Sequence, residues 1–241
     1  MIRRPKRQAV VEFVDLTDRV ADEYRPRPAK LNLPTWYKET GAYIDGKREA
    51  YMDERGFVSA TIKKCLPFYD AMSAGYLIFS PDDVEVTDSP VGKFYRWPRI
   101  GVAFHPKSQL GKLPVDLGDS NGVAKWASPW SIRTPRGYSC LIVNPIHRQT
   151  PTRIFEGVVD TDTYLPPIQF PFVLTDPEFT GIIPAGTPIA QVIPFRRESF
   201  RHEVLESTEE RRTVIEKSEA RLRSTFFNGY KERFWSPKDY R

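Results

Sequence analysis

Short apolar runs separated by turns rich in Asp, Pro and Gly recur through the middle of the chain. The most regular stretch extends from Gly157 to Phe195. This stretch begins with a strand pattern, which is followed by an Asp-rich turn and a second, buried strand. A Pro/Gly turn then precedes a further apolar run. Tyr138–Val143 is another strongly apolar run bounded by turn residues. This spacing is typical of strands, so the pattern predicts a mainly β fold centred on residues 157–195.

Weaker patterns on both sides extend this core. Ala9–Leu16 alternates apolar and polar residues and predicts an added strand, and Val58–Phe68 alternates well enough for another. Beyond the core the composition becomes charged, and Ser207 and Glu210 have the spacing of a capping box. The pattern there predicts a helix that ends near Ser224.

The frequency of proline indicates the domain organisation. The 241 residues include 22 Pro and 14 Gly, and Pro is excluded from helix interiors and central strands, so many turns must divide the chain into short segments. A hydrophobic content of 40% is sufficient for a buried core. We therefore expect an N-terminal arm over residues 1–56 and a β core over 57–200 with an aromatic, ordered insertion at 87–130. A C-terminal helix and an aromatic, basic tail would follow over 201–241.

Basic residues gather at both ends of the chain, whose net charge is +5. At the N-terminus they are Arg3, Arg4, Lys6 and Arg7. Such a segment is either a solvated tail, which is the favoured interpretation, or a contact for nucleic acid or an acidic protein surface. The tail over residues 230–241 mixes aromatic residues with Lys and Arg. It could stack on bases, but a packed aromatic anchor is the favoured interpretation.

The two cysteines, Cys65 and Cys140, lie far apart without a CxxC motif or a neighbouring histidine. This spacing argues against a zinc site, and the apolar surroundings predict two buried thiols. No P-loop, dinucleotide-binding glycine pattern or metal-ligand spacing is present. No apolar run has the length of a membrane span, and the N-terminus lacks a signal-peptide pattern, so we expect a soluble, intracellular protein without membrane contact.

Three parts of the sequence together resemble a known superfamily. They are SAGYLIFSPDDVEV (73–86), PRGYSCLIVNP (135–145), and the pair GVVDTDTY and AGTPIAQVIPF (157–195). In this order they resemble successive motifs of the dUTPase and dCTP deaminase superfamily, over residues 60–197. The resemblance implies a β-clip fold, which is a distorted barrel of short strands, and trimers whose active sites lie between subunits.

The same resemblance implies roles for residues of the Asp-rich turn. Asp160 stands at the position of the family's catalytic carboxylate, and Tyr164 lies one residue beyond its base-stacking tyrosine. A carboxylate here could deprotonate water for attack on a phosphate anhydride, with Mg²⁺ on the phosphates. Further candidates for ligand binding are the basic residues Arg136, His147 and Arg148. In the alternative interpretation, Asp160 and Asp162 form an Asx turn between two strands.

The sequence also departs from the family pattern. Leu77 replaces an acidic residue, Asn144–His147 replaces the phosphate-holding Pro-Arg-Ser-Gly, and no Gly-rich C-terminal lid motif is present. Phosphoryl chemistry needs several donors that converge on the charged oxygens. These departures therefore favour a protein without catalytic activity.

A second resemblance concerns KKCLPFYDAMSAGYLI (63–78), preceded by LPTWYK and with a Tyr-Lys segment near the C-terminus. It is similar to proteins of tailed phages, and β-clip proteins include trimeric phage head decoration proteins. The favoured function is thus a non-catalytic phage-type β-clip protein without cofactor, acting as an oligomeric binding or virion-associated structural component. The alternative is a divergent nucleotide-binding protein or a Mg²⁺-dependent nucleotide pyrophosphatase. Expected partners are further copies of the chain, including a trimer, other virion proteins and nucleic acid. The expected location is the host cytoplasm or the virion.

Overall fold

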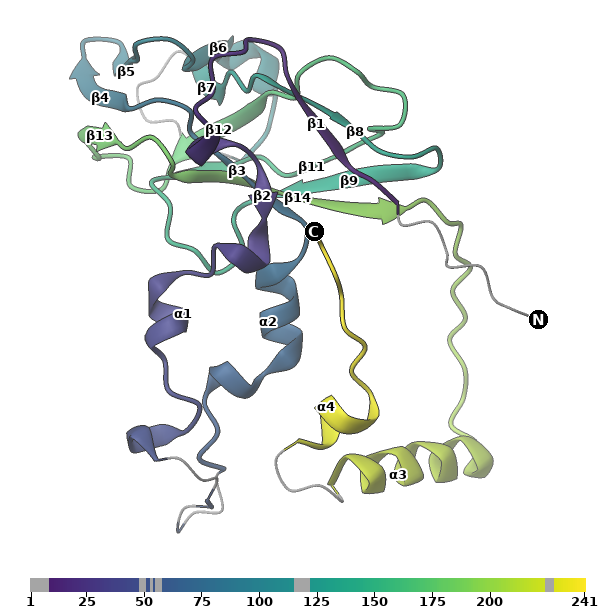
Figure 1. Cartoon of the computed structure of the whole chain (residues 1–241). Coiled ribbons are helices and arrows are strands. Elements are labelled where there is room, and N and C mark those ends of the chain that lie inside the picture. Colours follow the sequence, from purple (N-terminus) through teal and green to yellow (C-terminus); the bar gives the residue numbers. More distant parts are fainter. Residues whose placement is uncertain (1–8, 48–50, 53, 55–57, 115–121, 224–227) are drawn as a thin grey trace. The chain divides into compact units, whose positions relative to one another are not determined.

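The computed structural model describes residues 9–47, 51–52, 54, 58–114, 122–223 and 228–241 (Figure 1). The strands of these residues are β1 (Glu12–Asp15), β2 (Arg27–Pro28), β3 (Tyr76–Phe79), β4 (Val84–Ser89), β5 (Gly92–Arg96), β6 (Val102–Pro106), β7 (Gly122–Trp126), β8 (Trp130–Arg133), β9 (Tyr138–Val143), β10 (Thr152–Ile154), β11 (Gly157–Val159), β12 (Phe170–Leu174), β13 (Gly181–Ile183) and β14 (Pro188–Arg196). The helices are α1 (Thr35–Glu39), α2 (Leu66–Ser73), α3 (Glu209–Arg223) and α4 (Gly229–Arg233). Short 3₁₀ turns are η1 (Asp22–Tyr24), η2 (Ala29–Leu31), η3 (Ile44–Gly46), η4 (Ile62–Lys64) and η5 (Lys107–Leu110).

The chain divides into two compact units. The β unit combines the described residues up to Ala29 with Gly75–Arg197, and the helical unit combines Lys30–Ala74 with Glu198–Arg241. Each unit therefore joins segments that are far apart in the sequence, whereas the composition predicted three consecutive segments. The basic residues of the N-terminal segment 1–8 lie outside the described residues.

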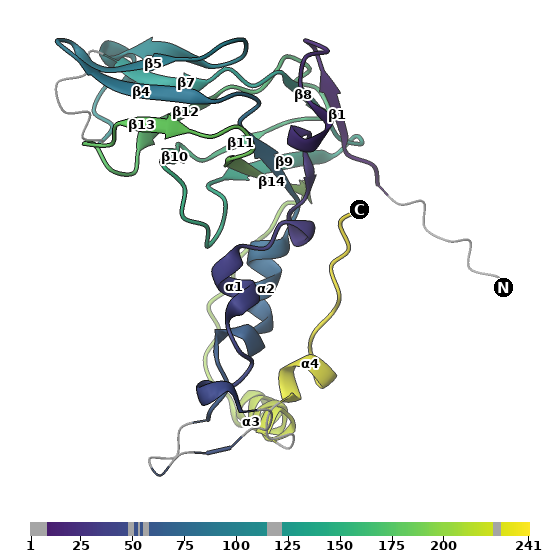
Figure 2. The same cartoon turned by 60° about the vertical axis from the view of Figure 1, so that its left-hand side comes forward.

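Antiparallel sheets build the β unit, so the predicted mainly β fold is confirmed. The largest sheet has the strand order β11-β9-β14-β3-β2, and the next has the order β10-β12-β7-β6. The order β13-β4-β5 forms a third sheet, and β1 pairs with β8, beside which it lies in both views (Figures 1 and 2). The predicted strand at Ala9–Leu16 is thus present as β1. Most of the pairings join distant segments, as expected for a β fold of high contact order.

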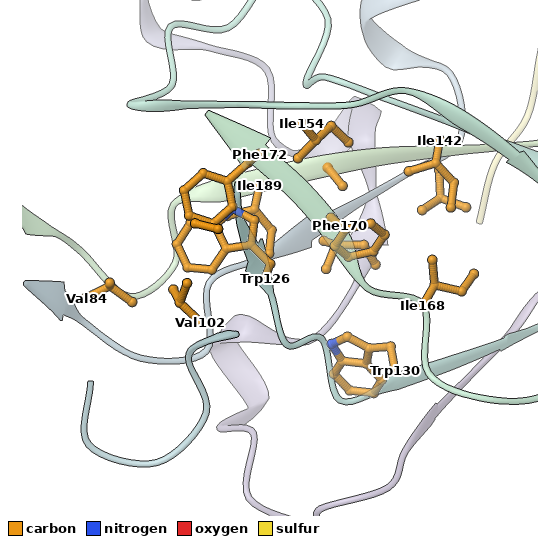
Figure 3. Packing of buried hydrophobic residues seen from close by; sticks show 14 of the residues in the cluster. Val84, Val102, Trp126, Trp130, Ile142, Ile154, Ile168, Phe170, Phe172 and Ile189 are labelled. Carbon is orange, nitrogen blue, oxygen red and sulfur yellow. The ribbon is translucent and has the colours of Figure 1, made fainter. Parts of the chain in front are cut away.

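The core of the β unit lies between these sheets and contains large aromatic side chains (Figure 3). Trp126 and Phe172 stack with ring centroids 4.9 Å apart, and both are almost fully buried. A stacked aromatic pair adds about 0.5–1.5 kcal/mol to the burial of its apolar surface. Trp126 belongs to the segment 87–130, whose strands β5, β6 and β7 complete two of the sheets. The predicted order of this segment is therefore confirmed, except for residues 115–121, which are not among those described.

The helical unit contains two short helices that lie side by side, α1 and α2 (Figure 2). Their aromatic side chains meet where Tyr37 stacks on Phe68 with ring centroids 6.5 Å apart. The C-terminal tail packs on the same unit, because Trp235 Nε1 and Lys238 Nζ donate to Asp70 Oδ2 at 2.9 and 2.6 Å. These contacts confirm the interpretation of the tail as a packed anchor.

Two predictions for this unit were partly wrong. Val58–Phe68 is not a strand: Val58 and Ala60 form isolated bridges, and the chain then turns through η4 into α2. Pro67, near the start of α2, has a φ that suits the first turn of a helix, so the local backbone preference overrides the alternation. Cys65 is exposed at the N-cap of α2, whereas Cys140 is buried as predicted.

The predicted charged helix is present as α3. Its first turn is capped by Thr208, whose Oγ1 accepts a hydrogen bond from Arg211 N at 3.4 Å, one residue beyond the Ser207 that the sequence pattern indicated. None of the helices in the described residues is long and apolar enough to cross a membrane.

Candidate functional site

Three strands of the largest sheet bring the Asp-rich turn next to the end of the last strand. β9 lies between β11 and β14, with Val159 opposite Cys140 on one side and Phe195 opposite Ser139 on the other. Asp160 therefore leaves β11 beside Ser139. Arg197 leaves β14 beside Gly137, and its N–H donates to the Gly137 carbonyl at 2.8 Å. The two residues flank the start of β9.

The Asp160 carboxylate contacts both of these neighbours. Ser139 Oγ donates to Asp160 Oδ1 at 2.6 Å, and Arg197 Nη1 lies 3.0 Å from the same oxygen. The hydrogen bond from Ser139, together with Arg197, lowers the pKa of Asp160 below its ordinary value of 3.8. The side chain is still 62% exposed, so solvent reaches the carboxylate.

Asp162 is held more tightly than Asp160. Arg197 Nη1 donates to Asp162 Oδ1 at 2.9 Å, and Arg197 Nη2 donates to Oδ2. Gly137 N also donates to Oδ2, at 2.8 Å. The hydrogen bonds from Arg197 and then from Gly137 lower the pKa of Asp162, whose side chain is only 3% exposed. Both carboxylates in turn raise the pKa of Arg197. One guanidinium thus pairs with two carboxylates, and we call Asp160, Asp162 and Arg197 the carboxylate cluster.

The turn that carries the two aspartates is closed by its backbone. The carbonyl of Asp160 accepts hydrogen bonds from Thr163 N at 3.0 Å and Tyr164 N at 2.9 Å, while its carboxylate reaches across to β9. Under the turn, Thr134 and Thr161 hydroxyls lie 2.7 Å apart, and Thr161 Oγ1 donates to the sulfur of Cys140 at 3.3 Å. Burial raises the pKa of the Cys140 thiol, which keeps it protonated and inert.

An open depression of about 870 Å³ borders the cluster. Asp162, Thr134 and Tyr138 line it from the side of the cluster, and Glu12 and Arg133 line it from the paired strands β1 and β8. Both charge signs and three hydroxyls, those of Thr134, Tyr138 and Thr161, are therefore present around it. This lining suits a polar ligand, and neither positive nor negative charge dominates among the lining residues.

The other predicted site residues lie apart from Asp160. Arg136 is exposed in the turn between β8 and β9, and Tyr164 is exposed at the edge of the Asp-rich turn. His147 and Arg148 lie beyond the opposite end of β9, and the four residue steps from Ser139 to Val143 correspond to about 13 Å. The structure thus brings Asp160 together with Arg197, and not with Arg148.

Arg148 is fixed in place by main-chain carbonyls. Its Nη1 donates to the carbonyl of Ile146 at 3.0 Å, and its Nη2 donates to that of Ala29 at 3.3 Å. Burial lowers the pKa of Arg148 to about 10. His147 is exposed with a positive φ of 56°, and partial burial together with Arg148 lowers its pKa. The hydrogen bond to Ala29, which directly follows β2, connects the loop to that strand. Arg148 therefore has a structural role.

Sequence reasoning missed Arg197, which lies just beyond the predicted strand that ends at Phe195. A signal was present, because Arg196 and Arg197 are adjacent bases at the end of an apolar run. The pairing of β14 with β9 was needed to select Arg197. Among the described residues, no group of three or more His, Cys, Asp or Glu side chains could hold a metal ion. Since Arg197 engages both aspartates, the cluster does not fit a protein-bound Mg²⁺.

No protein-family model and no curated protein matches the chain. Among solved structures, it is similar to a point mutant of the dUTPase of Staphylococcus bacteriophage 80alpha with dUpNHpp. The identity is 14% and the TM-score 0.32, over 83% of this chain and 90% of that chain. It is also similar to a point-mutant dUTPase from phage phi11 of S. aureus, which coordinates a structural Mg(II) ion. Here the identity is 14% and the TM-score 0.33, over 83% of this chain and 99% of that chain. A similarity at this level assigns neither a family nor an activity to the chain.

Proposed function

We propose that this chain is a non-catalytic protein of dUTPase-like architecture that acts as an oligomeric binding or structural component, associated with a phage particle. The carboxylate cluster carries the proposal. A general base works best when its pKa lies near the working pH and its lone pairs face the water to be deprotonated. Asp160 instead has a lowered pKa and shares Oδ1 between Ser139 and Arg197.

The loop at the other end of β9 supports the same conclusion. Asn144 uses its amide within the loop, since its Oδ1 accepts from Ile154 N at 2.8 Å and its Nδ2 donates to the Ile154 carbonyl at 3.2 Å. Ile146 N donates to Gln191 Oε1 at 2.9 Å, and the Arg148 guanidinium binds carbonyl oxygens. Donors that could hold phosphates at the position of the family's phosphate motif are therefore engaged by the chain itself.

The outward face of β1 supports the oligomeric part of the proposal. Val10, Val14 and Leu16, in and beside β1, are 61%, 37% and 56% exposed, and Glu12 stands on the same face. Exposed apolar side chains on an edge strand are a surface on which another chain can pack. Association of copies, including a trimer, would cover it, and light scattering of the purified protein would measure the stoichiometry.

A nucleotide assay tests the absence of catalysis. The purified protein would be incubated with dUTP, dCTP and other nucleotides in the presence of Mg²⁺, and pyrophosphate release would be measured. We expect no release above the rate without protein, and no difference between the native chain and Asp160→Asn. Robust release that Asp160→Asn abolishes would show the proposal to be wrong.

The alternative function is a divergent nucleotide-binding protein or nucleotide pyrophosphatase. One observation favours it: the Asp160 side chain is 62% exposed, beside an open depression lined by Asp162 and Thr134. A nucleotide that carries its own Mg²⁺ could approach from this side. Titration calorimetry measures the binding of a non-hydrolysable dUTP analogue. Binding of the analogue, together with no pyrophosphate release from dUTP in the nucleotide assay, would identify a nucleotide-binding protein.

A further inference from the structure

The helical unit contains a basic pocket that is separate from the carboxylate cluster. Its volume is about 320 Å³, and it lies between the start of α2 and the start of α4. Lys63, Lys64 and Lys231 line it together with Tyr230, and none of the described residues that line it is acidic. A concave site lined by one sign of charge concentrates ligands of the opposite sign.

Neutral groups hold two of these lysines in position. Lys63 Nζ donates to the carbonyl of Tyr37 at 2.6 Å and lies 4.6 Å from the centre of the Tyr37 ring. Lys64 Nζ lies 5.4 Å from the centre of the Tyr43 ring. Carbonyl oxygens and aromatic faces orient an ammonium group without removing its charge. Uncharged partners thus orient both ammonium groups, and the exposed Lys231 lines the pocket from α4.

The aromatic residues of the tail divide into two groups, and one of them includes Tyr230, which lines the pocket. Trp235 is directed toward Asp70 and anchors the tail. Tyr230 and Phe234 stack on each other, with centroids 6.4 Å apart and an angle of 23° between their planes, and they are 40% and 43% exposed. Exposed aromatic rings next to lysines are the combination with which proteins bind single-stranded nucleic acid, because bases stack on the rings while phosphates contact the cations.

We propose that this pocket binds single-stranded nucleic acid, with phosphates at Lys64 and Lys231 and a base stacked on Tyr230. The pocket volume lies at the lower end of the range for small-ligand sites, which suits one nucleotide of a longer strand. Stacking accepts every base, so binding has little sequence preference. The proposal is independent of the proposed function, because it concerns the other unit of the chain.

Fluorescence anisotropy of a labelled oligothymidylate with the full chain tests the proposal at several salt concentrations. Neutralising two phosphate contacts contributes about 1.4 to the slope of log affinity against log salt for a single strand. Lys64→Ala combined with Lys231→Ala is therefore expected to reduce the slope by about this amount. Tyr230→Ala is expected to weaken binding about tenfold, whereas Tyr230→Phe keeps the stacking ring and stays within about twofold.

The matched control for charge is Lys107→Ala combined with Lys112→Ala, which removes two exposed lysines of the β unit. It should leave the slope almost unchanged, and thermal melting would verify that all variants are folded. No binding by the native chain, or equal losses in the pocket and control variants, would overturn the proposal. The proposal would also be wrong if two results occur together: inorganic polyphosphate competes with the labelled strand as strongly as unlabelled oligonucleotide does, and Tyr230→Ala does not weaken binding. The pocket would then bind polyanions without stacking. A slope that falls only when Arg3, Arg4, Lys6 and Arg7 are replaced would assign the phosphates to the N-terminal segment instead.

Discussion

The two ends of β9 differ in how they use their charged residues. At its start, Arg197 joins Asp160 and Asp162, and an open depression borders the cluster. At its other end, Arg148 donates to the carbonyls of Ile146 and Ala29, so the donors of this loop bind acceptors of the chain itself. At the first end charged groups pair with one another, and the side chain of Asp160 stays exposed while that of Asp162 is buried. At the second end a partly buried guanidinium binds neutral carbonyl oxygens.

At the first end the charged groups pair with one another. Arg197, which follows β14, binds the carboxylates of Asp160 and Asp162 in the Asp-rich turn. At the second end the donors of the loop after β9 bind acceptors of the chain itself. An arginine beside a carboxylate favours the ionised form of the carboxylate, so the ion pairs at the first end can fix the acidic turn.

The largest expected effect concerns the closed end of β9. Arg148→Ala removes two hydrogen bonds from a largely buried guanidinium and leaves two carbonyls without their donors, so the free energy of unfolding should fall by about 3 kcal/mol. Urea denaturation measures this change. Arg136→Ala is the control, since Arg136 is exposed in a turn and its removal should cost less than about 0.5 kcal/mol. Equal effects of the two substitutions would contradict the contrast between the ends.

A smaller, pH-dependent effect is expected at the open end. The pKa values of Asp160 and Asp162 are lowered in the folded chain. Their contribution to stability is therefore present above the unfolded pKa of about 3.9 and is lost as the pH falls through the folded pKa values. Arg197→Gln removes a main cause of both shifts. Its melting temperature should lie below that of the native chain at neutral pH, and the difference should shrink as the solution is acidified below about pH 4.

Arg153→Gln is the matched control for this experiment, because it removes the same charge from an exposed position of β10. Its melting temperature should follow that of the native chain over the whole pH range. If Arg197→Gln shifts the melting temperature by the same amount at every pH, the carboxylates do not mediate its effect.

The smallest effect is expected for Tyr164→Ala. The side chain is 45% exposed, and the turn is held by the Tyr164 N–H and not by the ring. The free energy of unfolding should change by less than about 0.5 kcal/mol. Calorimetry with the dUTP analogue sharpens the comparison, because a large loss of affinity in this variant would indicate that the open end still binds a base.

Local patterns predicted a large part of the fold. Apolar runs identified β9 and β14, and the alternation from Ala9 to Leu16 identified β1, since strand formation follows the period of two in burial. The charged helix α3 was predicted from its capping residues within two positions. The failure at Val58–Phe68 arose because a short alternating run also suits a turn followed by a helix, and Pro67 favours the helix start.

The candidate site was only half predictable. The sequence alone determined that an acidic turn around Asp160 follows a strand, because turn chemistry is local. It could not determine that Arg197, 37 positions later, reaches this turn, or that Arg148 points to the opposite edge of the sheet. Those partners depend on which strands pair and in which register, and antiparallel pairing joins residues that no local pattern relates. The tertiary structure therefore decided that the acidic turn is an ion-paired cluster at one end of β9.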